Sequence, residues 1–447
     1  MRKLFAIWAA KLSAILGRLL GKKSSSTPGA IALKICPDLI RILKRNISEK
    51  VIVVCGTNGK TTTNNLLASA LSASGYKVVC NRLGANMLSG VAAAFALQCD
   101  WFGRLKADYV CLEIDEAYTK RVFGHIAPDI VVVTNLFRDQ MDRYGDISAV
   151  MDIMKDAFKK ANYPDLILNG DDPVSSGFGR DYKGKVYYFG ISEKVLTQNA
   201  DVGDGKFCAV CGSEQSYNYH HYSQLGDYFC TKCQNKRPKI DFEAKSVDLK
   251  DGIKFSVNGE ELKLNYKGFY NIYNILGVFG TMNLLGIKTE DFSKSFKNYK
   301  PQIGRMQEVD LGKPFILNLA KNPAGFNQAI QTVIEDPRKK DVVIAVNDNP
   351  SDGTDISWLW DVEFEKLKDD NLNTLSVLGM RRYDLGLRFK YEDIKVDIIS
   401  EDMKSVLKSC SLSDAEVCYV LVNYTMLFST ENTLNELKTE KERNNNE

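Results

Sequence analysis

The sequence predicts an α/β protein with two sheet-containing domains, and three observations predict it. A strand-type run, a Gly-containing turn and a helical pattern follow one another in VIVVCGTNGKTTTNNLLASAL, residues 51–71. Strand-like apolar runs then alternate with helical stretches, which favours a mainly parallel sheet covered by helices on both faces. The alternation resumes in the last third of the chain, which favours a second, smaller α/β domain.

The first segment, residues 1–46, is expected to hold an amphipathic helix and a linker. Residues 1–20 are too short and too charged to span a bilayer, and Lys11 interrupts the apolar run that a signal peptide needs. One face of the expected helix carries an apolar stripe formed by Leu4, Trp8, Leu12, Ile15 and Leu19. Two interpretations stay open: the stripe packs on the protein's own domain, or it makes peripheral contact with an anionic membrane surface.

The central domain is expected at 47–300, with an inserted module at 201–240 where polar residues replace the alternating pattern. The C-terminal α/β domain is expected at 301–447. Strand candidates of the central domain are 77–80, 109–114, 130–134, 166–169 and 252–257. Those of the C-terminal domain are 315–319, 342–346 and 417–422.

The composition argues against a nucleic-acid-binding protein and against a disulfide-rich one. Lys and Arg number 59 against 56 Asp and Glu, so no overall charge field favours nucleic acid as a partner. The 11 cysteines include two CxxC pairs, which suits a metal site in a reducing compartment better than a disulfide framework. We therefore expect a cytoplasmic protein.

The segment GTNGKTTT at 56–63 is the strongest chemical signal. Gly56 and Gly59 let backbone N–H groups approach phosphate oxygens, and the positive end of the following helix points at them. Lys60 is expected to pair with the terminal phosphates of a nucleotide, and Thr61 to place its hydroxyl on Mg²⁺. The alternative is a plain Gly turn after a strand.

A magnesium site needs hard oxygen ligands at neighbouring strand ends. Glu113 ends one predicted strand, and Thr134, Asn135 and Asp139 follow another. Acidic residues after strands are often only solvated loop residues. Their order after the phosphate loop favours Glu113 as the ligand.

The insert contains Cys208-x2-Cys211 and Cys230-x2-Cys233, separated by eighteen residues. Four thiolates at this spacing can surround one Zn²⁺ tetrahedrally, which leaves no open position and makes the predicted role structural. His220 and His221 lie between the pairs and are alternative ligands, but four cysteines suffice.

The segment NDNPSDGTDISWLWD at 347–361 is dense in turn formers and carboxylates. It predicts an Asx-rich loop that caps a helix, with Trp358 packed inward and Asp355 or Thr354 as the cap.

The chain carries, in this order, the motifs GTNGKTTT, LEIDEA, TNLFRDQMDRYG, LNGDDP, GFYNIYN, GRMQ and NLAKNP. Together they resemble the Mur ligase superfamily, the ATP-dependent amide ligases of peptidoglycan synthesis, so the central domain is expected to be a P-loop domain of that type. More narrowly, the cysteine insert and the 347–361 segment are similar to the MurT family, the ligase-like subunits of lipid II isoglutaminyl synthase.

The resemblance implies roles for individual residues. It implies that the triphosphate is held by Gly56, Thr57, Asn58, Gly59, Lys60, Thr61 and Thr62. It implies that Asn271 and Asn274 lie against the adenine, that Arg305 approaches the phosphates, and that Thr61 and Glu113 bind Mg²⁺. Lys60 and Glu113 are then catalytic, and so is Asp355, with Asp352 in reserve, as the carboxylate that completes a Cys-His pair in a glutaminase subunit.

The implied activity is ATP-dependent amidation of the D-glutamate α-carboxylate of the lipid II stem peptide to D-isoglutamine, through an acyl phosphate. A GatD-like glutaminase, bound as a heterodimer, supplies the ammonia. Gln140, Tyr270 and Lys321 stand where the standard ligases have histidines, which fits a nucleophile that needs no amino-acid pocket. The alternatives are a folylpolyglutamate-synthase-like ligase and a non-catalytic ATP-binding scaffold.

Overall fold

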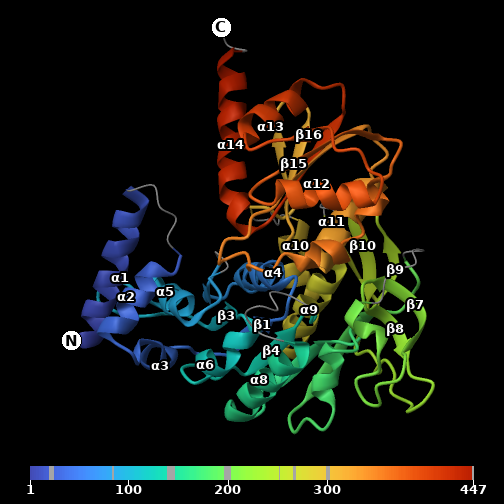
Figure 1. Ribbon diagram of the computed structural model, residues 1–447. Helices are drawn as coiled ribbons and strands as arrows, with labels where there is room; N and C mark the ends of the chain where they lie inside the picture. The colour runs from blue at the N-terminus through green and yellow to red at the C-terminus, as the bar shows by residue number, and fades with distance from the viewer. Residues whose placement is uncertain are drawn as a thin grey trace. The chain divides into compact units, whose positions relative to one another are not determined.

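The computed structural model describes residues 1–19, 25–82, 85–137, 146–195, 203–250, 252–264, 268–297 and 303–444. These residues form two compact units, the first ending at 297 and the second beginning at 303 (Figure 1). The sequence candidates Asp139 and Gln140 lie outside the described residues. Among the described helices, none combines the length and apolarity that a bilayer crossing requires.

The first unit begins with three helices, α1 (Arg2–Leu19), α2 (Thr27–Ile35) and α3 (Leu39–Lys44). Helix α1 buries Ala6, Ile7 and Ala10 and lies beside α2 and α5 (Leu88–Gln98) (Figure 1). Helices α2 and α5 pack so closely that a Cβ on Gly29 would stand 1.8 Å from the Ser89 carbonyl oxygen. The N-terminal helices are therefore packed on the rest of the first unit.

A nine-stranded sheet forms the centre of the first unit, in the order β11-β10-β9-β6-β5-β4-β1-β3-β2. Its strands are β1 (Val51–Cys55), β2 (Val78–Cys80), β3 (Tyr109–Glu113), β4 (Ile130–Val133), β5 (Asp165–Asn169), β6 (Val186–Ile191), β9 (Phe242–Asp248), β10 (Ile253–Val257) and β11 (Glu260–Leu264). Pairing is parallel from β2 to β9 and antiparallel at the β9-β10-β11 edge. The mainly parallel sheet is confirmed, and it places the loops after β1, β3 and β4 at one edge.

Helices cover this sheet. They are α4 (Lys60–Ala73), α5, α6 (Thr119–Phe123), α8 (Ile147–Lys160), α9 (Asn271–Leu284) and α10 (Thr289–Lys297), with short 3-10 helices at Glu116–Tyr118, Ser175–Gly179 and Gly203–Lys206. Helix α9 is buried along almost its whole length and packs against α4. The first helix after the phosphate loop is thus held from a distant part of the chain.

The cysteine insert contributes a two-stranded hairpin, β7 (Ser216–Tyr222) and β8 (Leu225–Phe229), that forms a sheet of its own. The second unit is built on a six-stranded sheet in the order β12-β13-β17-β14-β15-β16. Its strands are β12 (Gln307–Asp310), β13 (Pro314–Leu319), β14 (Lys340–Ala345), β15 (Leu372–Leu378), β16 (Ile398–Ile399) and β17 (Val417–Val422). All neighbours in this sheet are parallel except β12 and β13.

The second unit also contains α11 (Pro323–Glu335), α12 (Arg382–Tyr391), α13 (Met403–Leu412), α14 (Tyr424–Asn444) and two 3-10 helices, η4 (Ser357–Asp361) and η5 (Phe364–Leu367). The Asx-rich segment 347–361 ends in the 3-10 helix η4. Its N-cap residue is Ile356, which has no side-chain cap, and not Asp355 or Thr354 as the sequence predicted. Trp358 packs inward as predicted, 5.4 Å between ring centroids from Phe326, whereas Trp360 is exposed.

Candidate nucleotide and metal sites

The phosphate loop joins β1 to α4 through two glycines with positive φ. Gly56 has φ 122° and Gly59 has φ 84°, a region that side chains with a Cβ rarely adopt. A Cβ on Gly56 would meet the Thr134 hydroxyl oxygen at 2.4 Å, and a Cβ on Gly59 would meet the Asn274 side-chain oxygen at 2.2 Å. Both positions require glycine because the neighbouring strand end and α9 pack directly on the loop.

The residues after β4 hold this loop in place. The backbone N–H of Thr57 donates to the Asn135 carbonyl oxygen at 2.8 Å, and that of Asn58 donates to the Asn135 side-chain oxygen at 2.9 Å. The Thr134 hydroxyl donates to the Asn58 carbonyl oxygen at 2.7 Å. Thr134 and Asn135, both candidates for metal binding in the sequence, here fix the backbone of the phosphate loop.

Lys60 begins α4 and is buried. Its ammonium group donates to the carbonyl oxygens of Gly56 and Thr57 and forms an ion pair with Glu116, with 3.2 Å between the Lys60 Nζ and Glu116 Oε2. Glu116 lies in the LEIDEA motif, in which the sequence pattern favoured Glu113 instead. This carboxylate fixes the direction of the ammonium group and partly neutralises it inside the fold.

Glu113 ends β3 beside β1, where Val54 pairs with it in register. It is 4% exposed, and its Oε2 accepts no hydrogen bond from any described residue. Asn81 binds the backbone N–H and carbonyl of Glu113 at 2.9 and 2.8 Å, which fixes the strand end without occupying the carboxylate. A buried carboxylate oxygen without a donor is a suitable ligand for a hard cation such as Mg²⁺.

Helix α9 brings Asn274 to the other side of the loop. The Thr63 hydroxyl donates to the Asn274 side-chain oxygen at 3.2 Å, and the Asn274 amide donates to the Asn271 side-chain oxygen at 2.9 Å. These two asparagines therefore lie against the start of α4. Their predicted contact with an adenine stays a prediction.

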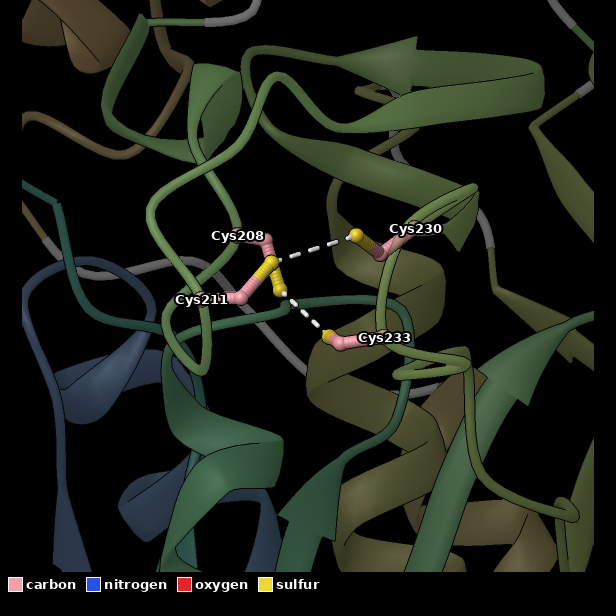
Figure 2. A group of neighbouring side chains, drawn as sticks. All are labelled: Cys208, Cys211, Cys230 and Cys233. Carbon is pink, nitrogen blue, oxygen red and sulfur yellow. Dashed lines mark hydrogen bonds between the residues drawn. The ribbon is translucent and has the colours of Figure 1, made fainter.

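The four cysteines of the insert come together, as Figure 2 shows. Their sulfur atoms lie within 4.8 Å of one another, with 3.5 Å between Cys208 and Cys233 and 3.6 Å between Cys211 and Cys230. Hydrogen bonds from Ser213 lower the pKa of the Cys211 thiol to about 6, which favours the thiolate that zinc binds. The cluster has the donor set and the spacing of a structural zinc site.

His221 lies outside this cluster and is used elsewhere. Its Nδ1 is 2.6 Å from the Tyr273 hydroxyl, and its Nε2 is 2.9 Å from the Glu193 carbonyl oxygen. The Tyr273 hydroxyl donates to Asp171 at 2.9 Å, and Asp171 also pairs with Arg237 at 2.6 Å. Because three of these residues are distant in sequence from Asp171, no local pattern indicated this network.

The tip of the cysteine hairpin reaches the loop that follows β4. Gln224, which is fully buried, donates to the Leu136 carbonyl oxygen at 2.7 Å and to the Asp172 carboxylate at 2.8 Å. Burial raises the pKa of Asp172, whose other oxygen accepts from the Leu136 N–H at 2.9 Å. The hairpin thus supports the segment that holds the phosphate loop.

In the second unit the two aspartate candidates differ in environment. Asp352 is buried and accepts hydrogen bonds from the backbone N–H and hydroxyl of Thr425, at 2.9 and 2.6 Å, at the start of α14. Asp355 is exposed, and its Oδ1 accepts from the Ser357 N–H at 2.8 Å. Arg305 precedes β12 in the same unit.

Comparison with known proteins gives two family-model matches, to the Mur ligase middle domain at residues 54–231 and to the MurT ligase C-terminal family at residues 319–427. The chain is 34% identical over 430 residues to the lipid II isoglutaminyl synthase (glutamine-hydrolyzing) subunit MurT of Staphylococcus aureus (strain COL), covering 96% of both chains. It is 32% identical to the subunit of the same name from Streptococcus pneumoniae (strain ATCC BAA-255 / R6), covering 93% of this chain and 96% of that one.

Solved structures share the fold. A pseudomurein peptide ligase type C from Methanothermus fervidus superposes with a TM-score of 0.70 at 22% identity, over 89% of this chain and 80% of that one. MurF ligase from Thermotoga maritima in complex with ADP gives 0.66 at 16% identity, over 92% and 85%. With identity to MurT subunits sustained over nearly the whole length, the chain belongs to the MurT family of Mur ligases.

Proposed function

We propose that the chain is the ligase subunit that amidates the D-glutamate α-carboxylate of the lipid II stem peptide, using ATP and ammonia from a glutaminase subunit. The observation that carries this proposal is the phosphate loop, held by Thr134, Asn135 and Asn274. Beside it, at the end of β3, the buried Oε2 of Glu113 accepts no hydrogen bond from a described residue. Similarity to MurT subunits over 96% of the chain supplies the substrate class.

Direct attack of ammonia on a carboxylate fails because the carboxylate is anionic and its oxygen is a poor leaving group. Transfer of the ATP γ-phosphoryl group to a carboxylate oxygen gives an acyl phosphate and ADP, and ammonia then displaces phosphate and loses a proton to leave the amide. The Lys60 ammonium group, which binds Glu116 and two loop carbonyls, would pair with the phosphate charge that moves during the transfer. Mg²⁺ held by Thr61 and Glu113 would neutralise further phosphate charge.

The four-cysteine cluster is proposed to bind a structural Zn²⁺. A bound Zn²⁺ would crosslink the cysteine insert, which is too small for a core of its own. Gln224 of the same insert binds the loop after β4. The metal would therefore stabilise the segment that holds the phosphate loop, and it takes no part in the chemical step.

The ammonia must arrive unprotonated, which a bound glutaminase achieves. We propose that Asp355 faces this partner and orients the histidine of its Cys-His pair, because Asp355 is exposed while Asp352 is used to cap α14. In the 3-10 helix that follows Asp355 in the sequence, Trp360 is exposed and packs against Tyr391 of α12 at 5.3 Å between centroids. Tyr383, Leu387 and Tyr391 are exposed on one face of α12, which offers an apolar surface for a heterodimer. Because the proposed substrate is lipid-linked, we propose that the complex acts at the cytoplasmic face of the membrane.

A reconstituted reaction tests the proposal. The chain and its glutaminase are mixed with ATP, Mg²⁺, glutamine and lipid II, and the products are read as released phosphate and, by mass spectrometry, as amidated stem peptide. Phosphate release matched by amide formation is the expected result. ATP binding without turnover would instead indicate the scaffold alternative, and turnover with a folate and glutamate would indicate the folylpolyglutamate-synthase-like one.

A further inference from the structure

Helix α1 turns an apolar face away from the rest of its unit. The side that packs inward is made of Ala6, Ile7 and Ala10. The opposite side exposes large apolar side chains, namely Phe5, Leu12, Ile15, Leu16 and Leu19. Three residues of the predicted apolar stripe are therefore left exposed, namely Leu12, Ile15 and Leu19, while Leu4 and Trp8 are half-buried.

A second element extends the apolar face. The turn 100–104 exposes Trp101 and Phe102, the latter by 75%. The turn is fixed to α1, since the Trp8 indole N–H donates to the Trp101 carbonyl oxygen at 2.8 Å. It is also fixed internally, because the Asp100 side chain accepts from the N–H groups of Phe102 and Arg104 at 2.9 and 2.8 Å. The two aromatic side chains are therefore held outward by a structured turn. We call the exposed residues of α1 together with Trp101 and Phe102 the α1 patch.

Basic side chains flank the α1 patch. The sequence of residues 1–37 contains seven Lys and Arg and no Asp or Glu, although the whole chain has a net charge of only +3. The Lys11 ammonium lies 5.3 Å from the centre of the Trp101 ring, and the Arg104 guanidinium lies 5.4 Å from that of Phe102. The one acidic side chain of the turn, Asp100, is occupied by the backbone of the turn itself.

From these observations we infer that the α1 patch docks the protein on an anionic lipid surface. Aromatic and aliphatic side chains next to Lys and Arg match the boundary between acyl chains and negatively charged headgroups. A protein partner would bury the same apolar area, but it would not by itself account for a basic segment without a single acid. The inference rests on the proposed function only in that a lipid-linked substrate gives the docking a purpose.

Vesicle flotation with the full chain, without ATP or glutamine, tests this inference. The probe is vesicles of phosphatidylcholine with or without phosphatidylglycerol. The chain is expected to float with the anionic vesicles and not with the neutral ones, and less so at higher salt. A variant with Leu16→Ser and Phe102→Ser is expected to lose at least tenfold in partition coefficient. A variant with Arg18→Gln and Arg104→Gln is expected to lose about fivefold per charge removed.

The control is Leu412→Ser, which removes a side chain that is 80% exposed in the second unit and outside the α1 patch. Its partition coefficient is expected to equal that of the wild type, and all variants should melt at the wild-type temperature. Equal binding to neutral and anionic vesicles, or an equal loss for Leu412→Ser, would overturn the inference. So would a dimer in sedimentation velocity that only the Leu16 and Phe102 variant dissociates, since a second copy would then cover the patch. Ligase activity on detergent-solubilised substrate is expected to be unchanged, so failure of docking and failure of the proposed function give different results.

Discussion

Gly59→Ala is expected to lower both the stability of the protein and its affinity for ATP, and to do so more than an alanine substitution at a glycine with similar φ and free space around it. Alanine in a left-handed backbone conformation costs about 1–2 kcal/mol. At Gly59 the added Cβ would also stand 2.2 Å from the Asn274 side-chain oxygen, which accepts the hydrogen bond from Thr63. Displacing Asn274 leaves buried polar groups without partners, at a further cost of about 1–3 kcal/mol. Together the backbone strain and the lost hydrogen bonds cost about 2–5 kcal/mol, of which one part lowers the free energy of unfolding and the other lowers the affinity for the nucleotide.

Gly75 offers a matched control at the other end of the same helix. Its φ is 91°, close to the 84° of Gly59, but a Cβ there would meet nothing within 4 Å. Gly75→Ala should therefore cost only the backbone strain, about 1–2 kcal/mol, and leave ATP affinity unchanged. Urea unfolding and titration with a fluorescent ATP analogue measure both effects. If Gly59→Ala is no worse than Gly75→Ala in stability and in ATP affinity, the packing of α9 on the loop does not hold the phosphate site.

Four further substitutions test the metal sites and the two aspartate candidates of the second unit. Glu113→Gln is expected to weaken ATP binding at least tenfold with Mg²⁺ but not with EDTA, by calorimetry, and an equal loss in both conditions would remove Glu113 from the metal site. Cys211→Ser is expected to reduce zinc from one equivalent to well below one, by elemental analysis, and to lower the melting temperature; a full equivalent of zinc would contradict the cluster. Asp355→Asn is expected to lower glutamine-dependent amidation at least tenfold while the ammonium-dependent rate stays at the wild-type value. Asp352→Asn should instead cost about 2 kcal/mol of stability through the lost α14 cap, and the reverse pattern would exchange the two roles.

Elements with a strong local pattern were predicted from the sequence. The strands at 109–114, 130–134 and 417–422 are recovered within a residue at each end as β3, β4 and β17, because buried parallel strands are continuous apolar runs. The cysteine cluster was predicted because its ligands are set by spacing alone. Apolar runs and cysteine spacing are both local patterns, so a single sequence is enough to predict these strands and this cluster.

Contacts between distant polar residues could not be predicted. Glu116 pairs with Lys60 across 56 residues, and Gln224 reaches Asp172 across 52. Nothing in the neighbourhood of these residues marks them as buried, since the same residue types on a surface look identical in sequence. The 3-10 helix after Asp355 was missed for a related reason: two tryptophans at a spacing of two residues, one inward and one outward, do not distinguish helix types.

The proposed function depends above all on the binding of phosphate by Lys60, which the amidation rate of Lys60→Ala measures. The assay is single-turnover formation of amidated lipid II with saturating ATP and ammonium, followed by mass spectrometry and normalised to the folded fraction, because the substitution leaves Glu116 buried without its ion-pair partner. A loss of at least about a hundredfold is expected, since an ammonium group that stabilises moving phosphate charge contributes several kcal/mol to the transition state. Amide formation at the wild-type rate would contradict it.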